Sequence, residues 1–110
     1  MERLFVYGTL APGKINHKVI AHIEGDWCVA RVRGRLVEAG WGADHGCLGM
    51  LLDEEGDYIE GFVLTAHFLD RHWSFLDEFE GEEYQRVKAQ VQLSKNKVVE
   101  AWVYCLKPSQ

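Results

Sequence analysis

Proline, cysteine and long apolar runs are all scarce in this sequence. It has two prolines and three cysteines among 110 residues, and no stretch approaches the roughly 20 apolar residues of a membrane span. The first segment carries an acid at position 2 and reaches a glycine at position 8, which predicts no signal peptide. An odd number of scattered cysteines is typical of reduced thiols rather than of a disulfide framework. We therefore expect a soluble, cytoplasmic protein that does not enter a membrane.

Positive charge is scarce as well. Twelve Lys and Arg against seventeen Asp and Glu leave a formal net charge of -5. A field of that sign repels nucleic acid and anionic membranes, so we expect neither as a partner. The hydrophobic fraction of 47% and the charged fraction of 26% exclude a disordered tail and a collagen-like rod. With no repeat or linker, the chain is predicted to form one domain over residues 1–110 that folds without disulfides or a metal.

Apolar periodicity and turn signals predict six strands and two helices. The strands are expected at residues 4–7, 28–36, 50–52, 58–65, 86–93 and 99–105, and the helices at residues 15–23 and 67–79. The last two strands flank a polar turn at residues 94–97, which predicts a hairpin. This order is that of an α+β domain whose sheet curls into a small barrel.

Arg31, Arg33 and Arg35 alternate with small and apolar residues along the second expected strand. Because successive side chains of a strand point to opposite faces, the three arginines are expected on the same face. Such a charge run usually marks a solvated face. The alternative interpretation is a basic binding stripe.

Residues 38–49 are rich in glycine, which occurs at positions 40, 42, 46 and 49. Glycine at this density destabilises helices and strands alike, so a long loop is predicted. Long loops inside compact domains are often functional. This loop, with Trp41 in it, is therefore a candidate rim of a pocket.

Glu80 is the first candidate for chemistry. It lies eleven residues after Leu69 on the apolar stripe of the second helix, and at about 100° per residue it returns to within roughly 20° of that stripe. Burial would raise the pKa of its carboxyl from about 4.3 toward the range of about 6–7 that suits an acid/base catalyst. The alternative is that the helix ends by Gly81 and Glu80 turns into solvent. Asp77 and Glu78 point away from the stripe and are expected on a solvated face.

The second candidate is the turn after the first strand, formed by Tyr7, Gly8, Thr9 and Leu10. A glycine at this place lets successive backbone N–H groups face a ligand, where they can hold a carboxylate or an oxyanion. The alternative is an ordinary turn that ends a strand. The segment does not match a phosphate-binding P-loop.

The sequence predicts neither a metal site nor a cofactor. Its five histidines form no H-x-H or H-E-x-x-H motif, and His67 and His72 would lie about 140° apart on a helix, too far round it to share a metal. A Cys–His nucleophilic pair stays open, although no cysteine lies at a turn that would activate it. The four tryptophans are most simply core or pocket-wall residues.

Three motifs follow one another along the chain: FVYGTL at residues 5–10, LDEFEG at residues 76–81 and YQR at residues 84–86. Together and in this order they resemble the gamma-glutamylcyclotransferase-like family, a group that includes gamma-glutamylamine cyclotransferases and AIG2-like proteins. The resemblance covers nearly the whole chain, since strand order, helix position and length also agree. It implies a small mixed β-barrel with two flanking helices.

The resemblance also implies roles for particular residues. Glu80 matches the glutamate of the family's D-x-x-E-G segment, which is the general acid/base. The turn from Tyr7 to Leu10 matches the segment that binds the glutamyl moiety through backbone amides. Tyr84 matches a tyrosine that lines the pocket, and Arg86 matches a basic position that we treat as a possible pocket residue.

The implied reaction is a cyclisation that needs no metal and no organic cofactor. The α-amine of a gamma-glutamyl small molecule attacks its own side-chain carbonyl, which gives 5-oxoproline and a free amine. One carboxylate can take a proton from the α-ammonium group and deliver one to the leaving amine. The glycine loop lacks a proline found in many relatives, so the identity of the leaving amine is not predicted.

Two other classes of function remain as alternatives. A non-catalytic binding module would use the same cavity for a small amino-acid-like metabolite, and its Glu80 would have an unperturbed pKa. A structural or interaction protein would use the aromatic residues and the arginine strand as a contact surface. The sequence does not decide between a monomer and a homodimer.

Overall fold

The computed structural model describes residues 2–7, 12–13, 17–37, 49–94 and 96–107. Within them, the number and order of the strands confirm what the periodicity predicted. The bounds are β1 Glu2–Val6, β2 Asp26–Val37, β3 Gly49–Leu52, β4 Asp57–Ala66, β5 Tyr84–Ser94 and β6 Lys97–Leu106. Several strands are a few residues longer than expected, because pairing with neighbours extends a strand beyond its apolar residues.

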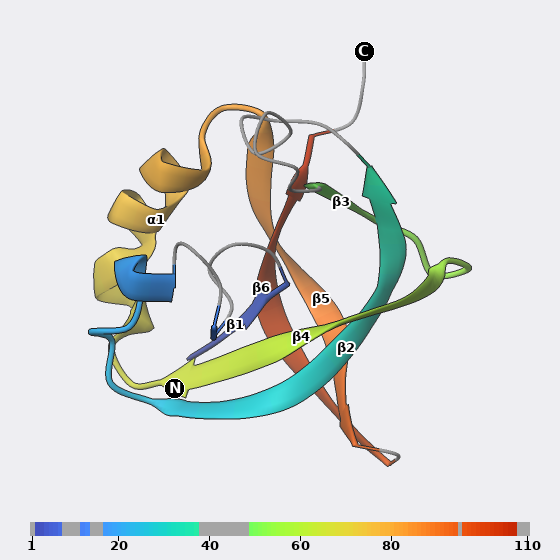
Figure 1. The fold of residues 1–110 in the computed structure, drawn as a ribbon, viewed down its shortest axis with the longest axis horizontal. Helices are drawn as coiled ribbons and strands as arrows, with labels where there is room; N and C mark the ends of the chain where they lie inside the picture. Colours follow the sequence, from blue (N-terminus) through green and yellow to red (C-terminus); the bar gives the residue numbers. More distant parts are fainter. Residues whose placement is uncertain (1, 8–11, 14–16, 38–48, 95, 108–110) are drawn as a thin grey trace.

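Five of the strands close into a barrel in the order β2-β4-β1-β6-β5, and β5 returns to β2 (Figure 1). β1 pairs antiparallel with β4 and parallel with β6, which makes the barrel mixed, as predicted. The closing contact is short: a single register pair joins Arg31 of β2 to Gln92 of β5. β3 adds to the sheet by pairing with residues 34–37 of β2.

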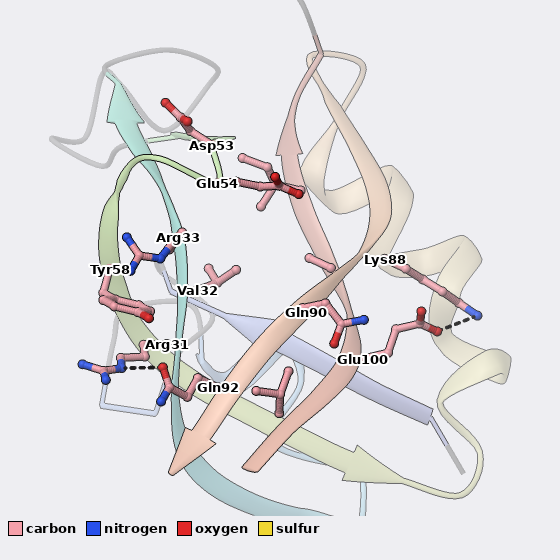
Figure 2. Close-up of a pocket in the computed structure, with 13 residues that line it drawn as sticks. Arg31, Val32, Arg33, Asp53, Glu54, Tyr58, Lys88, Gln90, Gln92 and Glu100 are labelled. Carbon is pink, nitrogen blue, oxygen red and sulfur yellow. Dashed lines mark hydrogen bonds and ion pairs between the residues drawn. The ribbon is translucent and has the colours of Figure 1, made fainter. Parts of the chain in front are cut away.

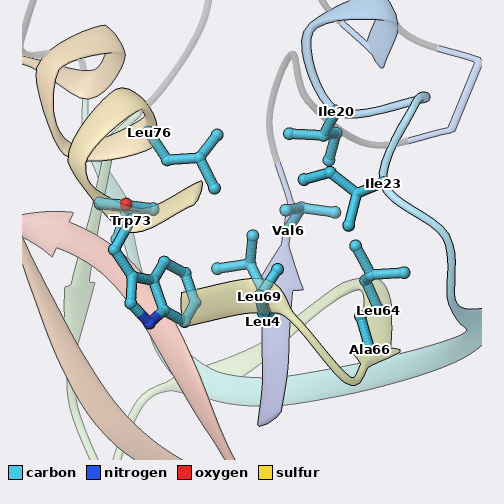
Figure 3. Packing of buried hydrophobic residues seen from close by; sticks show 10 residues of the cluster. Leu4, Val6, Ile20, Ile23, Leu64, Ala66, Leu69, Trp73 and Leu76 are labelled. Carbon is cyan, nitrogen blue, oxygen red and sulfur yellow. The ribbon is translucent and has the colours of Figure 1, made fainter. Parts of the chain in front are cut away.

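β1 is buried on both faces because it runs between two apolar layers. Phe5 packs with Val63 and Val103 in the cluster inside the barrel. Leu4 and Val6 belong to a second cluster, which lies between the barrel and the helical side of the molecule (Figure 3). The uninterrupted apolar run at the start of the chain reflects this burial on two sides, whereas a strand with one wet face alternates.

β2 shows that alternation. Ala30, Val32 and Gly34 are buried, while Arg33 and Arg35, on either side of Gly34, are exposed. The predicted wet face of this strand is confirmed for these two arginines.

The helical stripe predicted for residues 67–79 is confirmed, but the α-helix is shorter than expected. A 3-10 turn, η3 (Leu69–His72), precedes the helix α1 (Trp73–Glu80). Leu69 and Leu76 are completely buried, and Trp73 is nearly so. Neither η3 nor α1 begins with a side-chain cap, and without one the first turns of a helix are poorly stabilised.

The expectation of two flanking helices is wrong for the described part of the chain, where α1 is the single α-helix. The region of the first expected helix contains a 3-10 turn, η1 (His17–Val19), instead. Successive backbone hydrogen bonds spaced three residues apart, from Ile20 N–H to His17 and from Ile23 N–H to Ile20, continue it. A spacing of three still brings Ile20 and Ile23 to one side, so the apolar pattern is satisfied without an α-helix.

One close approach between strands requires glycine near the end of β1. Gly61 on β4 lies next to Phe62, which pairs with Val6. A Cβ atom at Gly61 would clash with the Val6 carbonyl oxygen and lie 2.8 Å from Cζ of Phe5. Glycine here therefore allows β4 to pass close to the point where β1 leads into Tyr7.

Candidate active site

Glu80 is the last residue of α1 and is partly buried. The helix stops there because Gly81 adopts φ 92°, a conformation open to glycine, and its N–H donates to the Asp77 carbonyl oxygen over 3.1 Å. Burial raises the pKa of the Glu80 carboxyl from 4.5 to about 7. The helix therefore ends at Gly81, as one alternative held, yet Glu80 does not turn fully into solvent.

Tyr7 faces the same place from the end of β1. Its hydroxyl donates to the Tyr104 carbonyl oxygen over 2.9 Å. Burial is the main cause that raises the pKa of Tyr7 far above its usual value, and the neighbouring Glu80, Tyr84 and Cys105 raise it further. These electrostatic interactions show that side chains from β1, α1, β5 and β6 converge at one point. The Tyr7 phenol keeps its proton at neutral pH and uses it in the hydrogen bond to Tyr104.

Asp77 connects α1 to the two last strands. Its carboxylate accepts a hydrogen bond of 2.5 Å from the Tyr104 hydroxyl and two from Arg86, of 2.9 and 3.3 Å. The hydrogen bond from Arg86 is the main cause that lowers the pKa of Asp77, and the bond from Tyr104 adds to it. Since Asp77 is one turn before Glu80, these bonds orient the end of the helix that carries the candidate catalytic carboxyl.

Arg86 is held on two sides by aromatic rings. Its guanidinium carbon lies 4.3 Å from the ring centroid of Trp73 and 4.6 Å from that of Trp102. The Trp73 indole in turn donates to the Glu2 carboxylate over 2.9 Å. Arg86 therefore holds α1 against β5 through its ion pair with Asp77.

Two members of this group, Asp77 and Tyr104, were not predicted as site residues. Asp77 was expected on a solvated face, and it is exposed, but it is also the acceptor for Arg86 and Tyr104. Tyr104 lies on the opposite face of its strand from Val103, and it is buried because the helical side covers that face. The signal that was available is the position of Asp77, three residues before Glu80 and nine before Arg86.

The other predicted residues divide into two groups. Tyr84 begins β5 and lies close enough to Tyr7 to raise its pKa. Four predicted residues lie outside the described residues: Gly8, Thr9, Leu10 and Trp41. Cys105, near the end of β6, is buried, and this burial raises the pKa of its thiol, which disfavours a nucleophilic role.

Metal-binding clusters and membrane-spanning helices are both absent from the described ranges. These ranges contain no group of three or more His, Cys, Asp and Glu side chains that could hold a metal ion. The helices described there include none that is long and apolar enough to cross a membrane.

A carboxyl with a pKa of about 7 beside neutral phenols has a definite chemical capability. At neutral pH both its protonated and its ionised form are well populated, so it can accept a proton and give one back with little change in free energy. The hydroxyls of Tyr7 and Tyr104 donate to the Tyr104 carbonyl oxygen and to Asp77, so they fix the geometry around this carboxyl rather than act as free donors.

Comparison with known proteins identifies a family that matches nearly the whole chain. Residues 4–110 match the family described as gamma-glutamyl cyclotransferase, AIG2-like. The human gamma-glutamylaminecyclotransferase is 35% identical over 106 residues, which include 88% of this chain. This chain spans 66% of the length of that human protein.

Solved structures show the same fold. The crystal structure of an AIG2-like protein from Mus musculus is 34% identical and has a TM-score of 0.65, with 96% of this chain and 76% of that one covered. YkqA from Bacillus subtilis is 29% identical with a TM-score of 0.71, and the match covers 96% of this chain and 35% of that one. The match over nearly all of its length shows that this chain belongs to the AIG2-like gamma-glutamyl cyclotransferase family, which is a family of enzymes.

Proposed function

We propose that this chain is a gamma-glutamyl cyclotransferase that converts a gamma-glutamyl compound into 5-oxoproline and a free amine, with Glu80 as the general acid/base. The observation that carries the proposal is the Glu80 carboxyl, partly buried at the end of α1 with its pKa raised to about 7. Membership of the family supports the class of reaction.

The proton balance of this reaction suits a single carboxyl group. The α-ammonium group of the substrate first loses a proton to solvent, and the free amine attacks the γ-carbonyl carbon to form a C–N bond. Glu80 takes a proton from the attacking nitrogen and delivers it to the leaving nitrogen, whose bond to the same carbon then breaks. No water is consumed, and the released amine takes up its last proton from solvent. Because the amine and the carbonyl belong to one substrate molecule, holding that molecule in the bent conformer that brings them together supplies much of the rate acceleration.

The remaining residues bind and position the substrate in this proposal. Backbone N–H groups of the turn from Tyr7 to Leu10 hold the glutamyl moiety, and Tyr84 lines the same pocket. The loop that carries Trp41 borders the side of the leaving amine. Arg86 acts through Asp77, since their ion pair orients the end of α1 and is not itself at the reacting atoms.

The test is release of 5-oxoproline from a panel of gamma-glutamyl amines, amino acids and dipeptides. The wild type is compared with Glu80→Gln, which keeps the shape of the side chain but can neither accept nor donate the proton. We expect the variant to lose at least about 100-fold in kcat on the best substrate, the lower end of the contribution of a general acid/base.

Glu78→Gln is the matched control, because Glu78 is exposed on the same helix. It should retain the wild-type rate. Comparable release by wild type and Glu80→Gln would refute the role of Glu80. If a well-folded wild type released no 5-oxoproline from any compound but bound one of them, the chain would instead be a metabolite-binding module.

A further inference from the structure

A groove of about 500 Å³ lies between β2 and β5, on the part of the barrel wall that a single register pair holds together (Figure 2). Its walls come from β2, the turn after β3, β4, β5 and β6, and it shares no lining residue with the site around Glu80. A volume of this size falls within the range of about 300–1,000 Å³ that small-molecule sites occupy.

Two arginines of β2 line this groove beside one aromatic ring. The guanidinium carbon of Arg31 lies 4.0 Å from the ring centroid of Tyr58, and that of Arg33 lies 4.3 Å from it. Arg31 also donates to the Gln92 side-chain oxygen over 3.3 Å, and Arg33 donates to the Gly56 carbonyl oxygen over 3.0 Å. Each guanidinium is thus oriented by a ring and by one hydrogen bond, with several N–H donors left over.

Neither Arg31 nor Arg33 forms an ion pair with a carboxylate in the part of the chain that the structure describes, although Glu60 is the register partner of Arg31 across β2 and β4. Neighbouring cations on the same surface are neutralised, since Arg35 pairs with Asp53 at 3.5 Å and Lys88 pairs with Glu100 at 3.4 Å. Contact with one ring keeps the two guanidiniums within the Debye length of about 10 Å at 0.1 M salt, so they repel each other. A bound anion would remove that repulsion.

We propose that this groove binds a small molecule through an oxyanion group, a carboxylate or a phosphate, held by the guanidiniums of Arg31 and Arg33. Planar guanidiniums form paired hydrogen bonds with both kinds of oxyanion. Leu52 and Val98 line the groove with exposed side chains and provide apolar contact for the body of the ligand, and the Gln90 amide adds a neutral polar group.

The sequence left open whether the arginines of β2 form a solvated face or a basic binding stripe. Arg33 and Arg35 are both solvated, as the commoner interpretation held, but only Arg35 of the two is neutralised within the described residues. Tyr58, which comes from the neighbouring strand β4, brings Arg31 and Arg33 to the same ring. The binding stripe therefore consists of two arginines and excludes the third.

The test is a titration of the ¹⁵N-labelled protein at pH 7 and low salt with inorganic phosphate and, separately, with succinate, followed by ¹H–¹⁵N correlation spectra that include arginine Nε–H signals. We expect saturable shifts at the side chains of Arg31 and Arg33 and at the amides of Tyr58 and Gln92. Tighter binding of phosphate would indicate a phosphorylated ligand, and tighter binding of succinate a carboxylate. Either result supports the proposal.

Single variants separate a built site from general surface charge. Arg31→Gln and Arg33→Gln should each weaken binding by about tenfold, the equivalent of one charge-assisted contact. Arg35→Gln removes the same charge from the same strand but not from the ring of Tyr58, so it should weaken binding clearly less than Arg33→Gln does. Arg31→Lys keeps the charge without the paired donors and should give an intermediate loss.

Absence of saturable shifts with both anions would overturn the proposal. Equal weakening by Arg35→Gln and Arg33→Gln would overturn it too, since binding would then follow net charge alone. Because the readout is binding, the result does not depend on whether the chain releases 5-oxoproline.

Discussion

Replacing Glu80 by glutamine should change how the free energy of unfolding depends on pH. An unperturbed glutamate carboxyl has a pKa of 4.5, whereas that of Glu80 in the folded protein is about 7, because burial disfavours the charged form. Between these values the folded state holds a proton that the unfolded state has released. Stability contributed by Glu80 is therefore present in full below pH 4.5 and is lost as pH rises through about 7.

The pKa values set the size of this effect. One pKa unit corresponds to about 1.4 kcal/mol, so ionising the partly buried Glu80 costs the folded state about 3 kcal/mol by pH 8. Glutamine is neutral at every pH. The free energy of unfolding of Glu80→Gln should therefore rise by about 3 kcal/mol relative to that of the wild type between pH 4.5 and pH 8. At a urea slope of about 1.5 kcal/mol/M, this gain moves the denaturation midpoint by about 2 M.

The assay is urea denaturation of wild type, Glu80→Gln and the control Glu78→Gln at several pH values from 4.5 to 8. Comparing variants at each pH removes the contributions of other groups, such as Asp77, whose lowered pKa acts in the opposite direction. Parallel stability curves for wild type and Glu80→Gln would refute the reasoning, since the carboxyl would then have the same pKa folded and unfolded. A slope change in Glu78→Gln as large as that in Glu80→Gln would also refute it.

Three further predictions concern catalysis and packing. The rate of 5-oxoproline release should rise with pH through about 7, because the ionised form of Glu80 accepts the proton, and a profile flat from about pH 6 to 8 would contradict this. Tyr104→Phe removes the hydroxyl that donates to Asp77 and should lower the free energy of unfolding by about 1.5–3 kcal/mol, measured by urea denaturation; an unchanged midpoint would show that this bond contributes nothing. Gly61→Ala would push a methyl group against the Val6 carbonyl oxygen and should destabilise the fold by about 1–3 kcal/mol, so a melting temperature equal to that of the wild type would disprove the close approach.

The success and the limits of the sequence analysis have physical causes that particular residues illustrate. The angle of about 100° per residue does not extend to Leu69, which lies in the 3-10 turn η3. The position of Glu80 relative to Trp73 and Leu76 was still predictable, because all three lie on α1 and the angle between residues of an α-helix depends only on their separation along the chain. The start of α1 was not, since it depends on how the uncapped turns around Leu69 and Trp73 pack against the barrel. The first expected α-helix is not formed, because apolar residues three or four positions apart also lie on one side of consecutive 3-10 turns.

The residues that support Glu80 illustrate the second limit. Asp77, Arg86 and Tyr104 are separated by up to 27 residues in the sequence, and they meet only because α1, β5 and β6 pack together. Alternation correctly separated Tyr104 from Val103 on β6, but it could not tell that the helical side would cover the Tyr104 face.

The sequence by itself determined the local features of this protein: the six strands, the apolar stripe of α1, the turns, and the motifs that carry the family resemblance. These features depend on the order and spacing of neighbouring residues. Only the tertiary structure decided the raised pKa of Glu80, the burial of Tyr104 and the groove in which Arg31 and Arg33 meet at Tyr58. The reason is that desolvation and charge–charge interaction depend on distance in space, and for these residues the decisive neighbours come from other strands and from the helical side.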